Sequence, residues 1–181
     1  EKNHLRLTLS RNNHKITAMK FFTTAQDFSY EFGDEVDLAV KLSKSEFRGQ
    51  ESLTLIIDDI KFSGLDNKEL IDEQRIYESI KRKEQVNSRL IQEHIPTRSD
   101  FSVLYKFLKA KNLINMDISV LYYRLKDSKI SFCKLLIMLD AMSECGLINV
   151  QTIADMYSIN VNPVNGKVDL ESSVIMKFLR K

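Results

Sequence analysis

An aromatic and a basic side chain stand side by side at a turn in the first third of the chain. Phe47 and Arg48 precede Gly49, between two runs in which apolar and polar residues alternate, and glycine can supply the positive φ that a tight turn needs. A ring can stack on a nucleobase and a guanidinium can pair with a phosphate, so this turn could bind nucleic acid. The residues alone leave an alternative open, in which Phe47 folds back over a barrel end and Arg48 pairs with Glu46 or Glu51.

The residue types needed for metal-dependent or nucleophilic catalysis do not occur at suitable spacings. A two-metal phosphoesterase needs clustered Asp and His ligands, but His4, His14 and His94 belong to no DHH triplet and no HExxH motif. Asp58 and Asp59 are adjacent, so in a strand they point to opposite faces and cannot chelate one metal together. The sequence also has no glycine-rich phosphate loop, GxSxG turn or Cys–His pair. We expect these residues alone to be catalytically inert, and we assign no catalytic or metal-binding residue.

Composition is that of a soluble globular protein. Hydrophobic residues make up 43% and charged residues 29% of the 181 positions, and no run approaches the roughly 18 apolar residues of a membrane span. The formal net charge is +2, and residues 1–64 hold 9 Lys and Arg against 10 Asp and Glu. A nucleic-acid-binding surface must therefore be local, and we expect no membrane partner.

The first residues and the two cysteines indicate the kind of chain and the cellular compartment to which this sequence belongs. The first residues include neither an initiator Met nor an apolar signal segment, so we expect a part of a longer chain. Cys133 and Cys145 are too far apart on one expected helix to bridge, which indicates a reducing compartment such as the cytoplasm.

Alternation predicts two hairpins before residue 64. Residues 5–9 and 16–22 form the first, joined by the turn-favouring Asn12-Asn13. Phe21 and Phe22 cannot both face the core of a regular strand, so either a bulge reconciles them or one ring is exposed.

The second hairpin spans residues 36–60, after a short helical turn over 23–28 with a threonine N-cap. Four strands, and a fifth pieced from residues beyond the second hairpin, fit a small Greek-key barrel. The pattern alone does not separate an OB barrel from an SH3-like one.

Helical periodicity dominates after residue 65. Asp66 caps a long helix over 66–92, with a break near residues 86–88 and a stop at Pro96. Caps at Ser99, Asp117 and Ser131 predict three further helices, and two strands flanking 162–166 predict a wing before a final helix. The fold class is α+β, with a small barrel domain over 1–64, a linker helix over 65–96, and a helical, winged-helix-like module over 97–181.

The third helix of that module is poorly suited to reading a DNA groove. It offers Lys134, with Asp140 and Glu144 on the side expected to be exposed, whereas bases are read by Arg, Lys, Asn and Gln. Protein contact, or packing against the rest of a longer chain, is the favoured role for this module.

Three blocks resemble one family of nucleases. Residues 4–9 (HLRLTL), 16–21 (ITAMKF) and 46–60 (EFRGQESLTLIIDDI) are similar, in this order, to the region behind the catalytic core of RecJ-type exonucleases, which cleave single-stranded DNA 5′→3′. The resemblance selects the OB fold, places this domain after DHH and DHHA1 catalytic domains, and implies a bacterial cytoplasmic protein of DNA repair and recombination. It also implies a divalent metal, Mn or Mg, held by those catalytic domains.

Strand phase and resemblance together predict a sequence-independent single-strand-binding surface that feeds the strand to the catalytic domains. The residues expected to form it are Arg6, Lys15, Lys20, Phe22, Lys41, Lys44, Phe47, Arg48 and Gln50.

The alternative function is a protein-interaction scaffold. In it the barrel packs on the parent catalytic domains, and the helical module docks a repair partner such as single-strand-binding protein or a helicase. The near-neutral charge of residues 1–64 favours this alternative, because phosphate binding needs an excess of cations.

Overall fold

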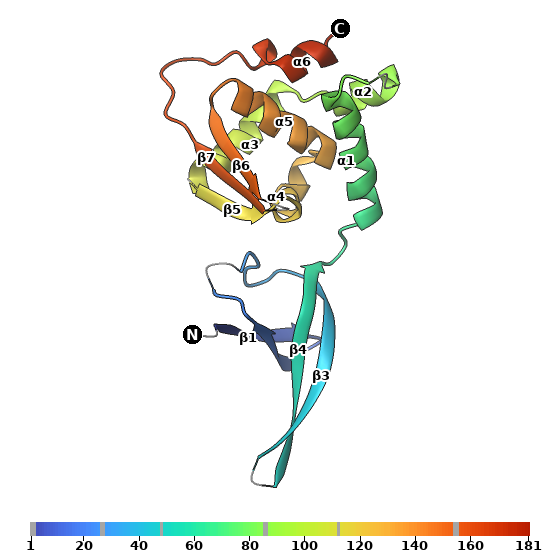
Figure 1. Cartoon of the computed structure of the whole chain (residues 1–181), viewed down its shortest axis with the longest axis vertical. Helices are drawn as coiled ribbons and strands as arrows, with labels where there is room; N and C mark the ends of the chain where they lie inside the picture. Colours follow the sequence, from blue (N-terminus) through green and yellow to red (C-terminus); the bar gives the residue numbers. More distant parts are fainter. Residues whose placement is uncertain (1–2, 26–27, 48, 85–86, 112, 154–155) are drawn as a thin grey trace. The chain divides into compact units, whose positions relative to one another are not determined.

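The alternating apolar residues of the first part of the chain form one four-stranded sheet (Figure 1). A computed structural model describes residues 3–25, 28–47, 49–84, 87–111, 113–153 and 156–181. The strands are β1 (His4–Arg11), β2 (His14–Phe21), β3 (Val36–Phe47) and β4 (Gln50–Phe62), in the order β1-β2-β4-β3. Both predicted hairpins are therefore confirmed.

The turns of the two hairpins use the residues that the sequence indicated. Asn12 and Asn13 have φ of 49° and 65°, the left-handed pair that a two-residue hairpin turn requires. Gly49 has φ of 75°, and Phe47 lies opposite Gln50 in the register of the second hairpin. Each turn thus fixes which residues face each other across its hairpin.

The two hairpins join through a parallel pair, β2 with β4, in which Ala18 lies opposite Leu55. The register places Leu7, Ala18, Leu55 and Leu42 on one face, because residues paired across strands share a face. Among the residues of this inner face, Ala18, Ile57 and Phe62 are buried.

A register shift between Ala39 and Val40 leaves Asp58 as an extra residue in β4. The shift keeps Ile57 and Ile60 on the same face, as a β-bulge does. The bulge interrupts the alternation by one residue, and the inner face stays apolar to the end of β4.

The helical turn predicted over residues 23–28 is wrong for its described positions. Residues 23–25 and 28 are not helical, and 26–27 lie outside the described residues. The Thr23 hydroxyl donates to the carbonyl of Phe21 at 3.2 Å and caps no helix. Beyond this segment, Tyr30 packs against Phe62, with ring centroids 4.6 Å apart, and donates its hydroxyl to the carbonyl of Ile60 at 2.8 Å.

A fifth strand of this sheet does not follow β4 in the described residues. The chain continues into the second of two compact units, Glu1–Leu65 and Asp66–Lys181. The helices of the second unit are α1 (Asn67–Lys81), α2 (Ser88–His94), α3 (Arg98–Lys111), α4 (Ile118–Arg124), α5 (Phe132–Glu144) and α6 (Val174–Leu179), with 3₁₀ turns η1 (Lys126–Ser128) and η2 (Leu170–Ser172). A three-stranded sheet has the order β5-β7-β6, with β5 (Leu113–Asp117), β6 (Ile148–Ile153) and β7 (Met156–Val161).

The predicted long helix over 66–92 is two helices. Asp66 caps α1 as predicted, accepting from the amides of Lys68 and Glu69, but α1 ends at Lys81 and Lys83 has a left-handed φ of 57°. Asn87 caps α2. The break between the helices therefore begins before residues 86–88, where it was predicted. Of these three residues, Val86 lies outside the described part of the chain.

Helix α1 packs on α5 within the second unit. The amide of Cys133, at the start of α5, donates to the Glu73 carboxylate at 2.7 Å. The Tyr77 hydroxyl donates to Asp140 of α5 at 2.6 Å, and Ile80 is buried in the same core. In the structure this helix belongs to the core of the second unit, while the division at 64/65 and 96/97 into three functional domains stays a prediction.

Helix α5 is the centre of the second unit. Of the two acidic residues expected on its exposed side, Glu144 is exposed, as predicted, and Asp140 is half-buried. From Phe132 to Met142 its residues are buried, apart from the half-buried Lys134 and Asp140. Lys134 lies 3.9 Å from Asp100, and Lys81 lies 3.0 Å from Asp140. Neighbouring helices thus satisfy the few polar groups of α5, because an unpaired buried charge is costly.

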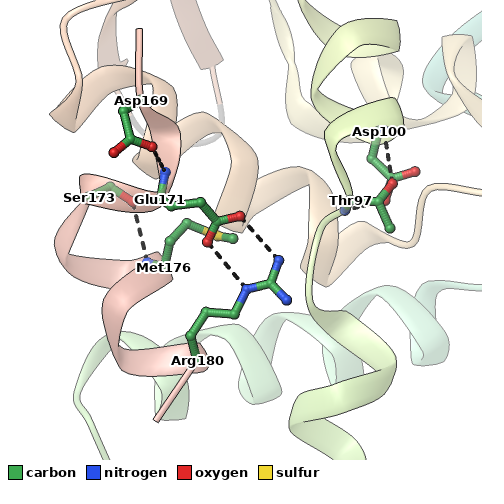
Figure 2. Close-up of polar contacts among 7 residues, drawn as sticks. All are labelled: Thr97, Asp100, Asp169, Glu171, Ser173, Met176 and Arg180. Atoms are coloured by element: carbon green, nitrogen blue, oxygen red, sulfur yellow. Dashed lines mark hydrogen bonds and ion pairs between the residues drawn. The ribbon is translucent and has the colours of Figure 1, made fainter.

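Side chains near the helix ends of the second unit satisfy free backbone groups (Figure 2). Thr97, not the predicted Ser99, begins α3: its amide donates to Asp100 at 2.8 Å, and the amide of Asp100 donates to the Thr97 hydroxyl at 3.2 Å. This reciprocal pair is a capping box with aspartate in the place of glutamate. Ser173 accepts from the amide of Met176 at the start of α6.

The chain leading into α6 is held in the same way. Asp169 accepts from the amide of Glu171, and Arg180 donates to both carboxylate oxygens of Glu171 at 3.1 and 3.2 Å (Figure 2). Glu144 of α5 accepts from the amides of Val174 and Ile175. The final helix predicted over 171–181 is therefore present, but it is shorter.

The hairpin predicted around residues 162–166 is not formed, although its first strand, residues 157–161, lies within β7. The sequence indicated a hairpin around Asn165-Gly166, but residues 162–168 form no strand, and β6 pairs with β7 instead, with Ile153 opposite Met156. Ile148, Val150 and Ile159 share the inner face of this sheet. Strand β6 pairs with β7 because Ile148 and Val150 cover α5, which outweighs the local turn preference of Asn-Gly.

A Tyr77→Phe substitution tests whether α1 is part of the core of the second unit. It removes the 2.6 Å hydrogen bond to Asp140, so we expect the free energy of unfolding to fall by about 1 kcal/mol. Urea unfolding measures the change, with Gln74→Ala on the exposed side of α1 as the control. An unchanged free energy of unfolding for Tyr77→Phe would indicate that α1 docks without this bond.

Candidate nucleic-acid interface

One face of the β1–β2 hairpin carries exposed polar, basic and aromatic side chains. The register pairs His4 with Phe21, Arg6 with Met19, Thr8 with Thr17, and Ser10 with Lys15. We call these eight residues the β1–β2 strip. They are exposed or half-exposed, none is acidic, and at about 3.3 Å per residue the strip is roughly 20 Å long.

Arg6 and Lys15 are the cations of the strip. Both side chains are exposed, and within the described residues neither has a hydrogen bond or ion pair. Their partners in the register are Met19 and Ser10. These two of the predicted site residues are therefore available to an anion on one face.

The other predicted lysines are already paired. Lys20 is paired with Leu5 in the register, which places it on the inner face by alternation, and its ammonium donates to the carbonyl of Asp58 at 2.8 Å. Lys41 forms an ion pair with Asp58 at 2.9 Å. Lys44 pairs with Glu51 and lies opposite Leu53, on the inner face. Lys20 and Lys44 thus lie away from the strip. Lys41 is on the outer face, in the cross-strand row that runs from Arg6 through Met19 and Ile56, but its ammonium is paired.

Three predicted site residues belong to the tip of the β3–β4 hairpin, and not all of them are among the described residues. Arg48 falls outside the described residues, and Phe47 and Gln50 are described in their backbone alone, as the last pair of the hairpin. Their role in binding stays a prediction.

The structure shows how the adjacent Phe21 and Phe22 are accommodated: both rings are exposed. Strand β2 ends at Phe21, which lies on the strip with a side chain 37% exposed. Phe22 follows with a left-handed φ of 57° and is 77% exposed. The predicted site residue Phe22 is therefore accessible, at the same end of the hairpin as Arg6.

His4 and Phe21 also face this region, and neither was predicted as a site residue from the sequence. A signal for both existed. A two-residue turn at Asn12-Asn13 dictates that His4 pairs with Phe21. Counting outward from that turn would have placed both residues on the face of Arg6.

Groups with displaced pKa values lie in the second unit and are held neutral. Burial, with Asp140 nearby, raises the pKa of Tyr77, and burial raises the pKa of Tyr122. Burial and the neighbouring Glu73 raise the pKa of Cys133 to about 12. An activated nucleophile needs the opposite direction of shift, so these groups are structural.

The described residues include neither a metal-binding cluster nor a membrane-spanning helix. No group of three or more His, Cys, Asp or Glu within the described segments could hold a metal ion. None of the helices in those segments is long and apolar enough to cross a membrane.

Comparison with known proteins identifies the first unit. Residues 1–59 match the family model described as the RecJ OB domain, which covers about a third of the chain. This part of the chain is an OB-fold region of a RecJ-type protein. Neither curated proteins nor solved structures gave a match.

The two cysteines provide a test of the packing around α5. Cys133 is buried with a raised pKa, whereas Cys145 is partly exposed. Because the thiolate is the reactive form, we expect a disulfide reagent at pH 8 to modify about one thiol in the native protein and both in denaturant. A Cys145→Ser variant should lose the fast reaction, and rapid reaction of both native thiols would contradict the described core.

Proposed function

We propose that the first unit binds single-stranded DNA without reading its sequence, as a non-catalytic part of a RecJ-like 5′→3′ exonuclease. Its role is to hold the strand and feed it to catalytic domains that carry a divalent metal, Mn or Mg. The described residues do not fit such a metal, so the strand is held here and cleaved elsewhere in the parent enzyme.

The observation that carries this proposal is the acid-free β1–β2 strip, whose Arg6 and Lys15 have no partner among the described residues. Cations in a row along an extended face suit the evenly spaced phosphates of a single strand. The strip also lies within the residues that match the RecJ OB domain, and OB folds bind oligonucleotides on a face of their sheet. Local cations therefore compensate for the near-neutral charge of residues 1–64.

The proposal includes a closed OB barrel. The parallel pair of β2 with β4, flanked by antiparallel neighbours, supports a Greek-key arrangement. The edge strands β1 and β3 have free backbone groups toward a further strand. A fifth strand between them would close the sheet.

For the second unit we propose a winged-helix module that contacts protein. Helix, strand, two helices and a hairpin follow one another as α3-β5-α4-α5-β6-β7, and the first strand pairs with the last. Helix α5, in the place of a recognition helix, is buried. That burial supports a role in protein contact, since a groove-reading helix needs an exposed polar face.

A second candidate function, the protein-interaction scaffold, is favoured by one specific observation. The inner face of the first sheet exposes Leu42 to 65% and Leu53 to 67%, with Val40 and Ile16 also exposed. Adjacent exposed apolar residues on one sheet face indicate a surface that another polypeptide covers. The two functions are compatible, because the β1–β2 strip and these leucines occupy opposite faces.

The DNA-binding proposal is tested by titrating the chain into a fluorescent oligo-dT at about 50 and 200 mM salt. Phosphate contacts release counterions, with a slope near −0.7 per contact on single strands. We expect Arg6→Ala and Lys15→Ala each to weaken binding several-fold at low salt and to flatten the slope by about 0.7.

The matched control is Lys68→Ala, which removes the same charge from α1. Arg48→Ala tests the β3–β4 tip in the same titration. Absence of binding at low salt, or an equal loss for Lys68→Ala, would reject the strip as a phosphate site.

The scaffold function is tested with a Leu42→Ser, Leu53→Ser double variant. Because both side chains are mostly exposed, the free energy of unfolding should change by less than about 1 kcal/mol. Calorimetric binding to separately produced parent catalytic domains should weaken at least tenfold and depend little on salt. Unchanged binding would argue against the scaffold, and Val174→Ser in the second unit is the control.

A further inference from the structure

Three aromatic rings gather at one end of the β1–β2 strip. The ring centroids of His4 and Phe21 lie 4.7 Å apart in an edge-to-face arrangement, and those of His4 and Phe22 lie 5.9 Å apart. Phe21 and Phe22 are 6.4 Å apart. These spacings are typical of rings that hold one another in place.

The cluster is exposed. Phe22 is 77% and Phe21 37% accessible, and His4 is also exposed. The left-handed backbone of Phe22 turns the chain at the end of β2, where Phe21 and Phe22 would otherwise point to opposite faces. A non-glycine residue adopts this conformation at an energetic cost, yet the ring gains little burial from it.

The charge around the cluster suits a polyanion. Arg6 is two residues from His4 on the same face of β1, and Lys15 lies at the far end of the strip. An apolar protein surface would gain little from cations beside the rings. A nucleotide, by contrast, offers a flat base for the rings and a phosphate for the guanidinium.

We propose that His4, Phe21 and Phe22 form a stacking subsite for the bases of the bound single strand, beside the phosphate contact of Arg6. This inference rests on the proposed function. It adds that the first unit distinguishes a strand with bases from a bare sugar-phosphate chain. The stacking is tolerant of base identity, because every base offers a π-face.

The test compares a fluorescent dT oligonucleotide with an abasic oligonucleotide of the same length, both titrated with the full 181-residue chain. Wild type should bind dT roughly tenfold more tightly than the abasic strand. Phe21→Ala and Phe22→Ala should weaken binding to dT several-fold and leave binding to the abasic strand unchanged. Arg6→Ala should weaken both.

Phe32→Ala is the matched control, since Phe32 is fully exposed in the first unit and lies outside the strip. Thermal unfolding monitored by circular dichroism checks that each variant is folded. Equal affinity of wild type for both strands, or an equal loss for Phe32→Ala, would overturn the stacking subsite and leave phosphate binding intact. Failure of wild type to bind either strand would overturn the proposed function as well.

Discussion

The register of the β1–β2 hairpin is the constraint on which the proposed binding surface depends. Asn12 and Asn13 both adopt left-handed conformations, and this two-residue turn sets which residues pair along the hairpin. A slip of one residue would move every side chain to the other face. With the observed register, the leucines of β1 face inward, while Arg6 lies on the outer face between His4 and Thr8.

The second unit is built around α5, and hydrogen bonds between carboxylates and helix N-termini hold its helices together. Carboxylates from other elements approach the ends of its helices: Glu73 accepts the amide of Cys133 at the start of α5, and Glu144 accepts the amides that begin α6. Such bonds satisfy free backbone groups and favour a negative charge at a helix N-terminus. They link distant parts of the chain, so the apolar α5 can be buried while its polar groups are satisfied.

Sequence patterns predicted those parts of the fold that depend on neighbouring residues alone, namely the hairpins and the helix caps. Alternation predicted both hairpins of the first unit, and side-chain chemistry predicted the caps Asp66 and Asp117. The hairpin predicted at Asn165-Gly166 is not formed because β7 pairs with β6, which packs on α5, and this contact outweighs the Asn-Gly signal. For the site, the sequence indicated Arg6, Lys15 and Phe22, but sequence alone could not reveal that Lys41 and Lys44 are paired with carboxylates.

We expect a bound single strand to lie along the outer face of β1 and β2. Amide chemical-shift mapping by NMR, with the chain titrated by an oligo-dT at about 50 mM salt, tests it most directly. We expect the largest shifts on residues 4–10 and 15–22, with small shifts in the second unit. Shifts concentrated in the second unit, or no shifts at saturating oligonucleotide, would contradict this claim.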